Sequence, residues 1–293
     1  MREERRYSTC RGATVVRAED LAAMDRPEAE QAIRQAVQHV YLGDHTALTR
    51  ILGYHKFFVD TRDVGFGGHV LLDGFWESWL TLFCLRNVTR DMVAVDVGAN
   101  MGYYTILFGN NVGPDGHVIA VEPNPYAVSL LRKSVDINGY TARTRIAELA
   151  CSDGTSSRAR LAIPDTEPKN AHVLDDADIS SLSAIDIACT TLDELCRTHD
   201  RVDFIKIDAE GAEERIFAGM SGVLARHRPM VVIEINVARY ADPAGFVRRL
   251  SGVYGVLRHV SYDGQAQAIT EQELLSRNAG QDWLVVLSPE KPL

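Results

Sequence analysis

The stretch Asp96-Val97-Gly98-Ala99-Asn100-Met101-Gly102 ends a short apolar run that begins at Met92, and a helical pattern follows from Tyr103. Glycines let a backbone approach a ligand closely, and a turn of this kind presents amide groups at the start of a helix. The stretch therefore predicts a strand, a ligand-binding glycine turn and a helix, which together open a Rossmann-like α/β sheet.

The glycine turn differs from the fingerprint of dinucleotide-binding proteins. That fingerprint reads G-x-G-x-x-G, whereas this turn reads D-x-G-x-N-x-G. A carboxylate at Asp96 repels a pyrophosphate but favours a ligand with positive charge, such as S-adenosylmethionine (AdoMet), which carries an amino group and a sulfonium. The pattern favours AdoMet over NAD, and the alternative is a glycine-rich loop with a purely structural aspartate.

A second acidic residue, Glu122, ends the next apolar run, His117 to Val121. In Rossmann-like sites an acidic residue at the end of the second strand accepts hydrogen bonds from the ribose hydroxyls. Glu122 lies 26 positions after Asp96 and is followed by Pro123 and Asn124. The two acids together predict a nucleoside site.

Strand-like and helix-like patterns alternate from residue 91 onward, which indicates a mostly parallel α/β sheet. Strands are expected over 92–97, 117–121, 144–150, 202–207, 230–235, 256–260 and 283–287. Helices are expected to begin at residues 103 and 246 and to span 127–137 and 212–226. The polar segment 153–191, which includes Ser180-Ser181, is expected to be an insertion.

The chain is divided into three parts: a helical appendage over 1–55, a lead-in segment over 56–90 and the AdoMet-binding domain over 91–293. In the appendage, Asp25 before Arg26-Pro27 predicts a helix start, and apolar residues continue at helical spacing to Tyr41. A second short helix is expected from Asp44 to Leu52. The appendage is expected to pack on the core, to cover the active site or to mediate dimerisation.

A polar cluster is expected where two central strands end. Lys206 and Asp208 share one face of the fourth strand because side chains alternate, and Glu210 follows; Glu234 and Asn236 have the same two-residue period on the fifth strand. Ligands bind at this edge of open α/β sheets. The alternative is a structural ion pair between Lys206 and Glu234 with the other acids in solvent.

The net charge of −9 argues against nucleic acid as the partner, because an acidic surface repels polyphosphates. No apolar run approaches the ~20 residues that cross a bilayer, and no signal peptide is expected at the N-terminus. The five cysteines lack C-x-x-C spacing, which argues against zinc and a disulfide framework and favours a reducing cytoplasm. A homodimer is left open.

The chain resembles the FkbM family of AdoMet-dependent methyltransferases from about Phe57 to about Asn236. The resemblance rests on four stretches, extended by Arg228-Pro229 and Glu234: Gly74-Phe75-Trp76-Glu77, Asp96-Val97-Gly98-Ala99-Asn100-Met101-Gly102-Tyr103-Tyr104-Thr105, Ala120-Val121-Glu122-Pro123-Asn124-Pro125 and Lys206-Ile207-Asp208-Ala209-Glu210-Gly211-Ala212-Glu213. It implies a class I sheet of seven strands with a C-terminal antiparallel strand.

The resemblance also implies site residues. Those expected to hold AdoMet, from the resemblance or the glycine turn, are Glu77, Asp96, Gly98, Asn100, Gly102, Glu122, Asn124, Ala150 and Cys151. Glu77 would close over the cofactor, and Ala150 and Cys151, at the end of the third strand, would lie near the adenine.

The implied reaction is methyl transfer to a hydroxyl oxygen of a sugar or of a secondary metabolite such as a polyketide or glycolipid. A carboxylate among Asp208, Glu210 and Glu234 is expected to accept the hydroxyl proton. The same oxygens are compatible with a divalent cation, which the sequence does not require. Three alternatives stay open: methyl transfer to nitrogen, a non-catalytic AdoMet-binding module, and, least favoured, an NAD-dependent dehydrogenase.

Overall fold

The computed structural model of the protein describes residues 8–10, 13–163, 171–174, 184–277 and 280–293. Within these residues the largest sheet has eight strands, in the order β16-β15-β17-β14-β13-β6-β7-β8. Their bounds in this order are Ala266–Ala268, Arg258–Val260, Trp283–Leu287, Met230–Ile235, Phe204–Ile207, Val93–Val97, His117–Val121 and Thr144–Ala147. The five strands from β14 to β8 are parallel, and β17 runs antiparallel to β14.

This topology confirms the expected mostly parallel α/β sheet with an antiparallel C-terminal strand. The eighth strand, β16, is a departure from the expected seven. It pairs with β15 through a tight turn in which the Ser261 N–H donates to the Gln265 carbonyl at 2.9 Å. Because β16 is only three residues long and mostly exposed, its sequence carries no apolar pattern that would predict a strand.

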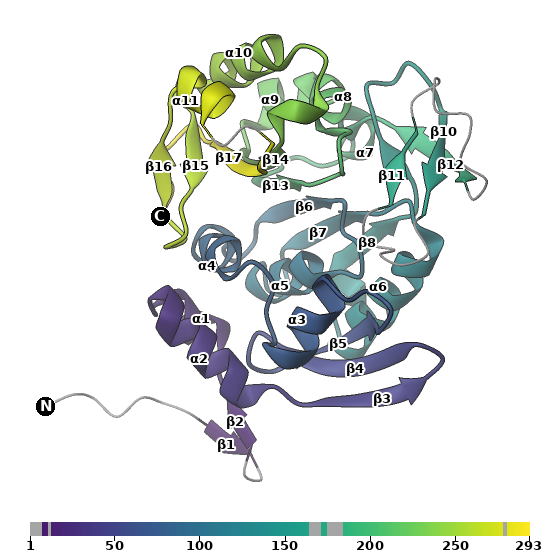
Figure 1. Ribbon diagram of the computed structural model, residues 1–293, viewed down its shortest axis with the longest axis vertical. Helices are drawn as coiled ribbons and strands as arrows, with labels where there is room; N and C mark the ends of the chain where they lie inside the picture. The colour runs from purple at the N-terminus through teal and green to yellow at the C-terminus, as the bar shows by residue number, and fades with distance from the viewer. Residues whose placement is uncertain (1–7, 11–12, 164–170, 175–183, 278–279) are drawn as a thin grey trace, which may run out of the picture.

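Helices cover both faces of the sheet (Figure 1). One face carries α4 (Ser78–Asn87), α5 (Tyr103–Asn111) and α6 (Pro125–Ile137), and the other carries α7 (Leu192–Leu195), α8 (Glu213–Ala218), α9 (Ser221–His227), α10 (Pro243–Tyr254) and α11 (Glu271–Ser276). Side chains alternate along each buried strand, so that Val95 and Val97 of β6 pack on one face while Ala94 packs on the other. The sheet is therefore the middle of three layers.

The chain before the sheet contains β1 (Ser8–Cys10), β2 (Ala13–Val15), α1 (Ala18–Ala22) and α2 (Arg26–Ala36), followed by a three-stranded sheet and α3 (Phe66–Leu72). The three strands are β3 (His39–Gly43), β4 (Thr46–Ile51) and β5 (His55–Asp60). The start of α2 is as expected, since the Asp25 side chain accepts from the Glu28 N–H at 2.9 Å. The Phe58 N–H donates to Ser134 Oγ at 3.0 Å, which joins this small sheet to α6.

The helix expected from Asp44 to Leu52 is wrong, and so is the helical reading of residues 40 and 41, which lie in β3. Gly43, Asp44 and His45 all have positive φ angles and make the turn between β3 and β4. In β4 the buried positions include Thr49, whose hydroxyl donates to the Val70 carbonyl at 3.3 Å. A buried threonine hides the two-residue period of the strand, so that the apolar residues alone fall at helical spacing.

Two further elements differ from expectation. The third strand ends at Ala147, and Ala150–Cys151 forms β9 of a separate four-stranded sheet, in the order β11-β10-β12-β9. The other strands are β10 (Arg158–Ala162), β11 (His172–Val173) and β12 (Ala184–Thr190), so the expected insertion has a sheet of its own; Ser180-Ser181 lie outside the described residues. The helix expected over 212–226 is two helices, α8 and α9, which are separated at Gly219. A Cβ at Gly219 would lie 2.0 Å from the Ser152 carbonyl oxygen, so a larger residue does not fit there.

No helix in the described part of the chain is long and apolar enough to span a membrane. Among the described residues, the short 3₁₀ helices are η1 (Thr141–Arg143) and η3 (Val237–Arg239). The second of these follows β14 directly and carries a charged side chain to the edge of the sheet where the parallel strands end.

Candidate functional site

A cavity of about 550 Å³ lies where β6, β7, β13 and β14 end, which is a usual size and place for a small-molecule site in an α/β fold. Ten of the twelve residues expected in the site line it: Glu77, Gly98, Asn100, Glu122, Asn124, Ala150, Cys151, Asp208, Glu210 and Glu234. Asp96 and Gly102 are not among the lining residues. The cavity therefore gathers residues from both halves of the sheet.

Two glycines of the turn lie so close to neighbouring segments that a larger side chain would not fit. Gly98 has a φ of +73°, and a Cβ there would lie 1.7 Å from the Asp208 carbonyl oxygen, so only glycine lets the turn sit against the end of β13. Gly102 has a φ of +99°, and a Cβ there would lie 2.3 Å from a methyl group of Leu131. Gly98 thus forms the cavity wall, whereas Gly102 packs α5 against α6.

Asp96 lies behind the cavity wall. Its side chain is fully buried, and Oδ2 accepts a hydrogen bond from the Thr105 hydroxyl at 2.6 Å. Along β6, Asp96 points to the face opposite Val95 and Val97 and is in register with Lys206 of β13. Because side chains alternate along the strand, the Asp96 carboxyl lies beneath the glycine turn. There it bonds to Thr105 and does not line the cavity.

Glu122 forms one side of the cavity at the end of β7. Its two carboxylate oxygens each accept a backbone N–H at 2.8 Å, from Asn100 and from Asn124. Asn124 in turn caps α6, because its side chain accepts from the Tyr126 N–H at 3.0 Å. An ionised carboxylate has about four acceptor positions, so Glu122 keeps capacity for two hydroxyl donors of a ligand.

Burial raises the pKa of Glu122 to about 7, against the opposing effect of the two amide donors. Hydrogen bonds from two hydroxyls favour the ionised form. We therefore expect the affinity for S-adenosylhomocysteine, the demethylated form of AdoMet, to be greatest above pH 7 and to fall by up to about tenfold for each pH unit below 7. Calorimetric titrations between pH 5.5 and 8 measure this. The Glu122→Gln variant should bind weakly with a flatter profile, and the same slope in that variant would contradict the assignment.

One end of the cavity is apolar. Leu149, Ala150 and Cys151 contribute to it, and the four-stranded sheet adds Leu161 and Val173. Ala150 and Cys151 are buried and line the cavity, but they belong to β9 and not, as expected, to the third strand of the main sheet. An uncharged aromatic ring fits this end, because burial there removes apolar surface from water without stranding a charge.

The opposite end of the cavity is acidic and begins with the ion pair between a buried lysine and a partly exposed aspartate. Lys206, 2% exposed, donates from Nζ to Asp208 Oδ2 at 3.0 Å, and its ammonium lies 4.9 Å from the Tyr104 ring centroid. The alternative pairing of Lys206 with Glu234 is therefore wrong. Register explains this, since Lys206 lies opposite Val232 of β14, two residues before Glu234.

Glu77 enters the acidic end from the turn before α4. It has a φ of +38°, which is uncommon for a non-glycine residue, and Oε2 accepts from the Tyr104 hydroxyl at 3.1 Å. Burial, followed by the negative charge of Asp208, raises the pKa of Glu77 to about 7. The strained turn aims this carboxyl into the cavity, where the expected cofactor contact stays a prediction.

Glu213 fixes the loop that carries Asp208 and Glu210. The Glu213 carboxylate is 1% exposed and accepts from the N–H groups of Ala209 and Gly211 at 2.9 and 3.1 Å, and from the Tyr240 hydroxyl at 2.8 Å. Glu210 itself adopts a φ of +51° and lines the cavity. A buried carboxylate with these donors holds the loop in one conformation.

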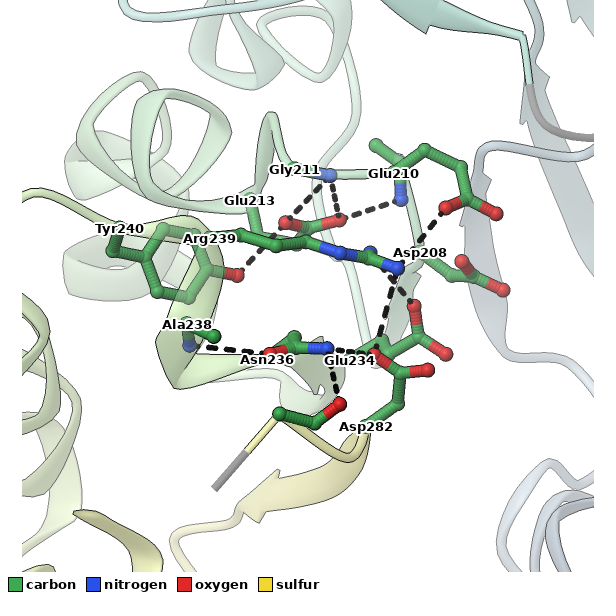
Figure 2. Close-up of polar contacts among 12 residues, drawn as sticks. Asp208, Glu210, Gly211, Glu213, Glu234, Asn236, Ala238, Arg239, Tyr240 and Asp282 are labelled. Carbon is green, nitrogen blue, oxygen red and sulfur yellow. Dashed lines mark hydrogen bonds and ion pairs between the residues drawn. The ribbon is translucent and has the colours of Figure 1, made fainter.

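Two charged residues of the cavity were not expected from the sequence. Arg239 of η3 and Asp282, just before β17, both line it, and Arg239 lies between Glu210, Glu234 and Asp282 (Figure 2). The two are 43 positions apart, and neither falls in a recognisable motif. Asn236, expected in the cluster, instead tethers Asp282, since its Nδ2 donates to Asp282 Oδ1 at 2.9 Å.

The acidic end also bears on metal binding. Within the described residues, no group of three or more histidine, cysteine, aspartate or glutamate side chains is arranged to hold a metal ion. Four carboxylates at this end instead contact Lys206 or Arg239: Asp208, Glu210, Glu234 and Asp282.

Comparison with known proteins identifies a related family. The profile of the FkbM methyltransferase domain matches residues 96–262, which is more than half of the chain. A protein-L-isoaspartate O-methyltransferase from Methanothrix thermoacetophila is 32% identical over 71 residues, which is 24% of this chain and 32% of that protein.

Two solved structures align with part of this chain. The methyltransferase FkbM from Methylobacillus flagellatus aligns with a TM-score of 0.40 and 16% identity over 61% of this chain and 42% of that one. TYW2 from P. horikoshii, solved in complex with MeSAdo, aligns with a TM-score of 0.41 and 15% identity over 84% of this chain and 71% of that one. The matched region thus spans about a third of the curated relative and less than half of the first structure.

Proposed function

Because the chain belongs to the FkbM methyltransferase family, we propose that it transfers the methyl group of AdoMet to a hydroxyl oxygen of a sugar or of a secondary metabolite such as a polyketide or glycolipid. The observation that carries the proposal is the ion-paired carboxylate of Asp208, which lines the cavity at the acidic end. Membership of the family supports methyl transfer as the reaction. The carboxylate supports a hydroxyl acceptor, because a hydroxyl has to lose a proton when it is methylated.

The side chains that line the cavity suit the three parts of AdoMet: its ribose, its adenine and its positively charged end. Glu122 has acceptor capacity for two hydroxyls, the end formed by Leu149 to Cys151 and the four-stranded sheet suits an adenine, and the acidic end suits positive charge. A pyrophosphate fits poorly, because the lining contains six carboxyl groups and, among the described residues, only Lys206 and Arg239 as lysine or arginine.

When bound, AdoMet supplies an electrophilic methyl group on a positively charged sulfur. The protein contributes placement, because holding acceptor and methyl group together replaces a bimolecular encounter. As the acceptor oxygen forms its bond to the methyl carbon and the carbon–sulfur bond breaks, the hydroxyl proton must leave. Asp208 is placed to accept it.

Asp208 suits this role better than the other two acids expected to act as the base. Burial, followed by the negative charges of Asp208, Asp282 and Glu77, raises the pKa of Glu234 far above its usual range, and its side chain is paired with Arg239. Burial also raises the pKa of Glu210, which is partly exposed and paired with Arg239. Lys206 instead keeps a full positive charge at 3.0 Å from Asp208.

Transfer of a labelled methyl group tests the proposal directly. The protein is incubated with methyl-labelled AdoMet and a panel of neutral sugars, glycolipids and polyketides, each beside an amine-bearing analogue, and the products are located by mass spectrometry. We expect label on a hydroxyl oxygen. Label on nitrogen alone would replace the proposal with an amine methyltransferase, and bound AdoMet without transfer to any acceptor would favour a non-catalytic module.

A further inference from the structure

The Arg239 guanidinium contacts three carboxylates that come from three separate segments of the chain. It lies 3.4 Å from Glu210 Oε2 in the loop after β13, 3.7 Å from Glu234 Oε2 on β14 and 3.6 Å from Asp282 Oδ1 before β17 (Figure 2). The Arg239 side chain is 33% exposed and lines the cavity. One side chain therefore links the segments that form the acidic end.

The turn that carries Arg239 is itself held in place. Asn236 accepts from the Ala238 N–H at 3.1 Å and donates from Nδ2 to Asp282 Oδ1 at 2.9 Å and to the Gly280 carbonyl at 3.2 Å. The next residue, Tyr240, donates to Glu213 at 2.8 Å. Arg239 thus starts from a fixed backbone and is held by contacts on both sides.

Several other charged or titratable groups face this cluster. They are Asp208 and Lys206 from β13 and its loop, Glu213 from α8, Tyr240 after η3 and Glu77 from the turn before α4. Lys206 is engaged with Asp208. Arg239 is therefore the cation nearest to Glu210, Glu234 and Asp282 within the described residues.

Resting on the proposed function, we infer that Arg239 is a positioning residue of the acidic end: it holds Glu210, Glu234 and Asp282 around the cavity and sets the pH at which Glu210 and Glu234 become charged. An opposite charge within 4 to 6 Å favours the ionised form of a carboxyl group. Arg239 offsets the repulsion among the three acids, so that the acidic end can receive the positively charged methyl donor near neutral pH.

The electrostatics of the individual groups agree with this role. Burial and Asp208 raise the pKa of Glu210, and Arg239 opposes them. The negative charge of Asp282 is among the causes that raise the pKa of Glu234. Removing Arg239 should therefore move the ionisation of Glu210 to higher pH, whereas removing Asp282 should move the ionisation of Glu210 and Glu234 to lower pH.

Proton release on AdoMet binding tests the inference. AdoMet is titrated calorimetrically into wild-type protein and variants between pH 5.5 and 9, in two buffers with different ionisation enthalpies, which gives the number of protons released at each pH. We expect the pH of greatest release to lie about 1 unit higher in Arg239→Gln, close to wild type in Arg239→Lys and lower in Asp282→Asn. Ionisation of AdoMet itself is the same for every variant and cancels in the comparison.

S-adenosylhomocysteine, which lacks the sulfonium charge, serves as the control for folding and for the nucleoside site. Variants that bind it as the wild type does, but show the wild-type pH of greatest release, overturn the inference. Asp282→Asn, whose side chain is 46% exposed, keeps this test decisive should Arg239→Gln fail to fold. Wild-type protein that binds neither nucleoside would instead overturn the proposed function, and the inference with it.

Discussion

Replacing Asp208 with asparagine is expected to lower kcat for methyl transfer by about 10²- to 10⁴-fold, the usual contribution of a positioned general base. The amide keeps the shape of the side chain and an oxygen that accepts from Lys206, but it cannot take up the acceptor proton. The measurement is steady-state kinetics with an acceptor found in the labelled-methyl assay. Affinity for S-adenosylhomocysteine should change only a few-fold, because Glu122 and the apolar end are untouched.

Two controls accompany this prediction. Glu210→Gln, on the same loop, should retain kcat within about tenfold, since a single, partly exposed ion pair is worth about 1 kcal/mol or less. In Asp208→Asn the buried Lys206 ammonium loses its charged partner, which can itself disturb the site. The double variant Asp208→Asn with Lys206→Met removes that ammonium as well, so that a remaining loss of activity reports the missing base. Wild-type kcat in Asp208→Asn would eliminate Asp208 as the base.

Replacing Gly98 with alanine is expected to destabilise the protein by about 3 kcal/mol or more and to weaken AdoMet binding by more than about tenfold. The new Cβ would lie 1.7 Å from the Asp208 carbonyl oxygen at a φ of +73°, so the glycine turn and the loop after β13 have to separate. Because both segments line the cavity, stability and binding should fall together.

Gly252→Ala is the matched control for this substitution. Gly252 lies within α10, and its Cβ would meet no atom within 4 Å. Alanine in a helix interior should stabilise the protein by about 0.5 to 1 kcal/mol. Chemical denaturation and calorimetry measure both variants, and a Gly98→Ala protein with wild-type stability and affinity would contradict the described packing of the turn.

The sequence predicted the central sheet well because its buried strands are short apolar runs between turn residues. The expected strand 283–287 coincides with β17, and the first strand differs from β6 by one residue. Prediction failed where tertiary contacts override local pattern. Thr49 is buried in β4 because its hydroxyl finds a carbonyl partner, and the chain leaves the sheet after Ala147 to pair Ala150–Cys151 with β12.

The site was predictable where one motif supplies both the residue and its geometry. Glu122, at the end of an apolar strand, is an example, and so is the pair of Lys206 and Asp208 on one strand face. Arg239 and Asp282 could not be predicted in this way. Their contact depends on a 3₁₀ turn after one strand and on the start of another, which only the folded sheet brings together.

Binding of nucleosides to the wild-type protein and to Glu122→Ala tests the account most directly. Calorimetric titrations with AdoMet, S-adenosylhomocysteine and NAD are compared at pH 7.5. We predict that the wild type binds the first two and not NAD, and that Glu122→Ala loses at least about tenfold in affinity for both. Tight binding of NAD with no binding of AdoMet would contradict the assignment of the cavity.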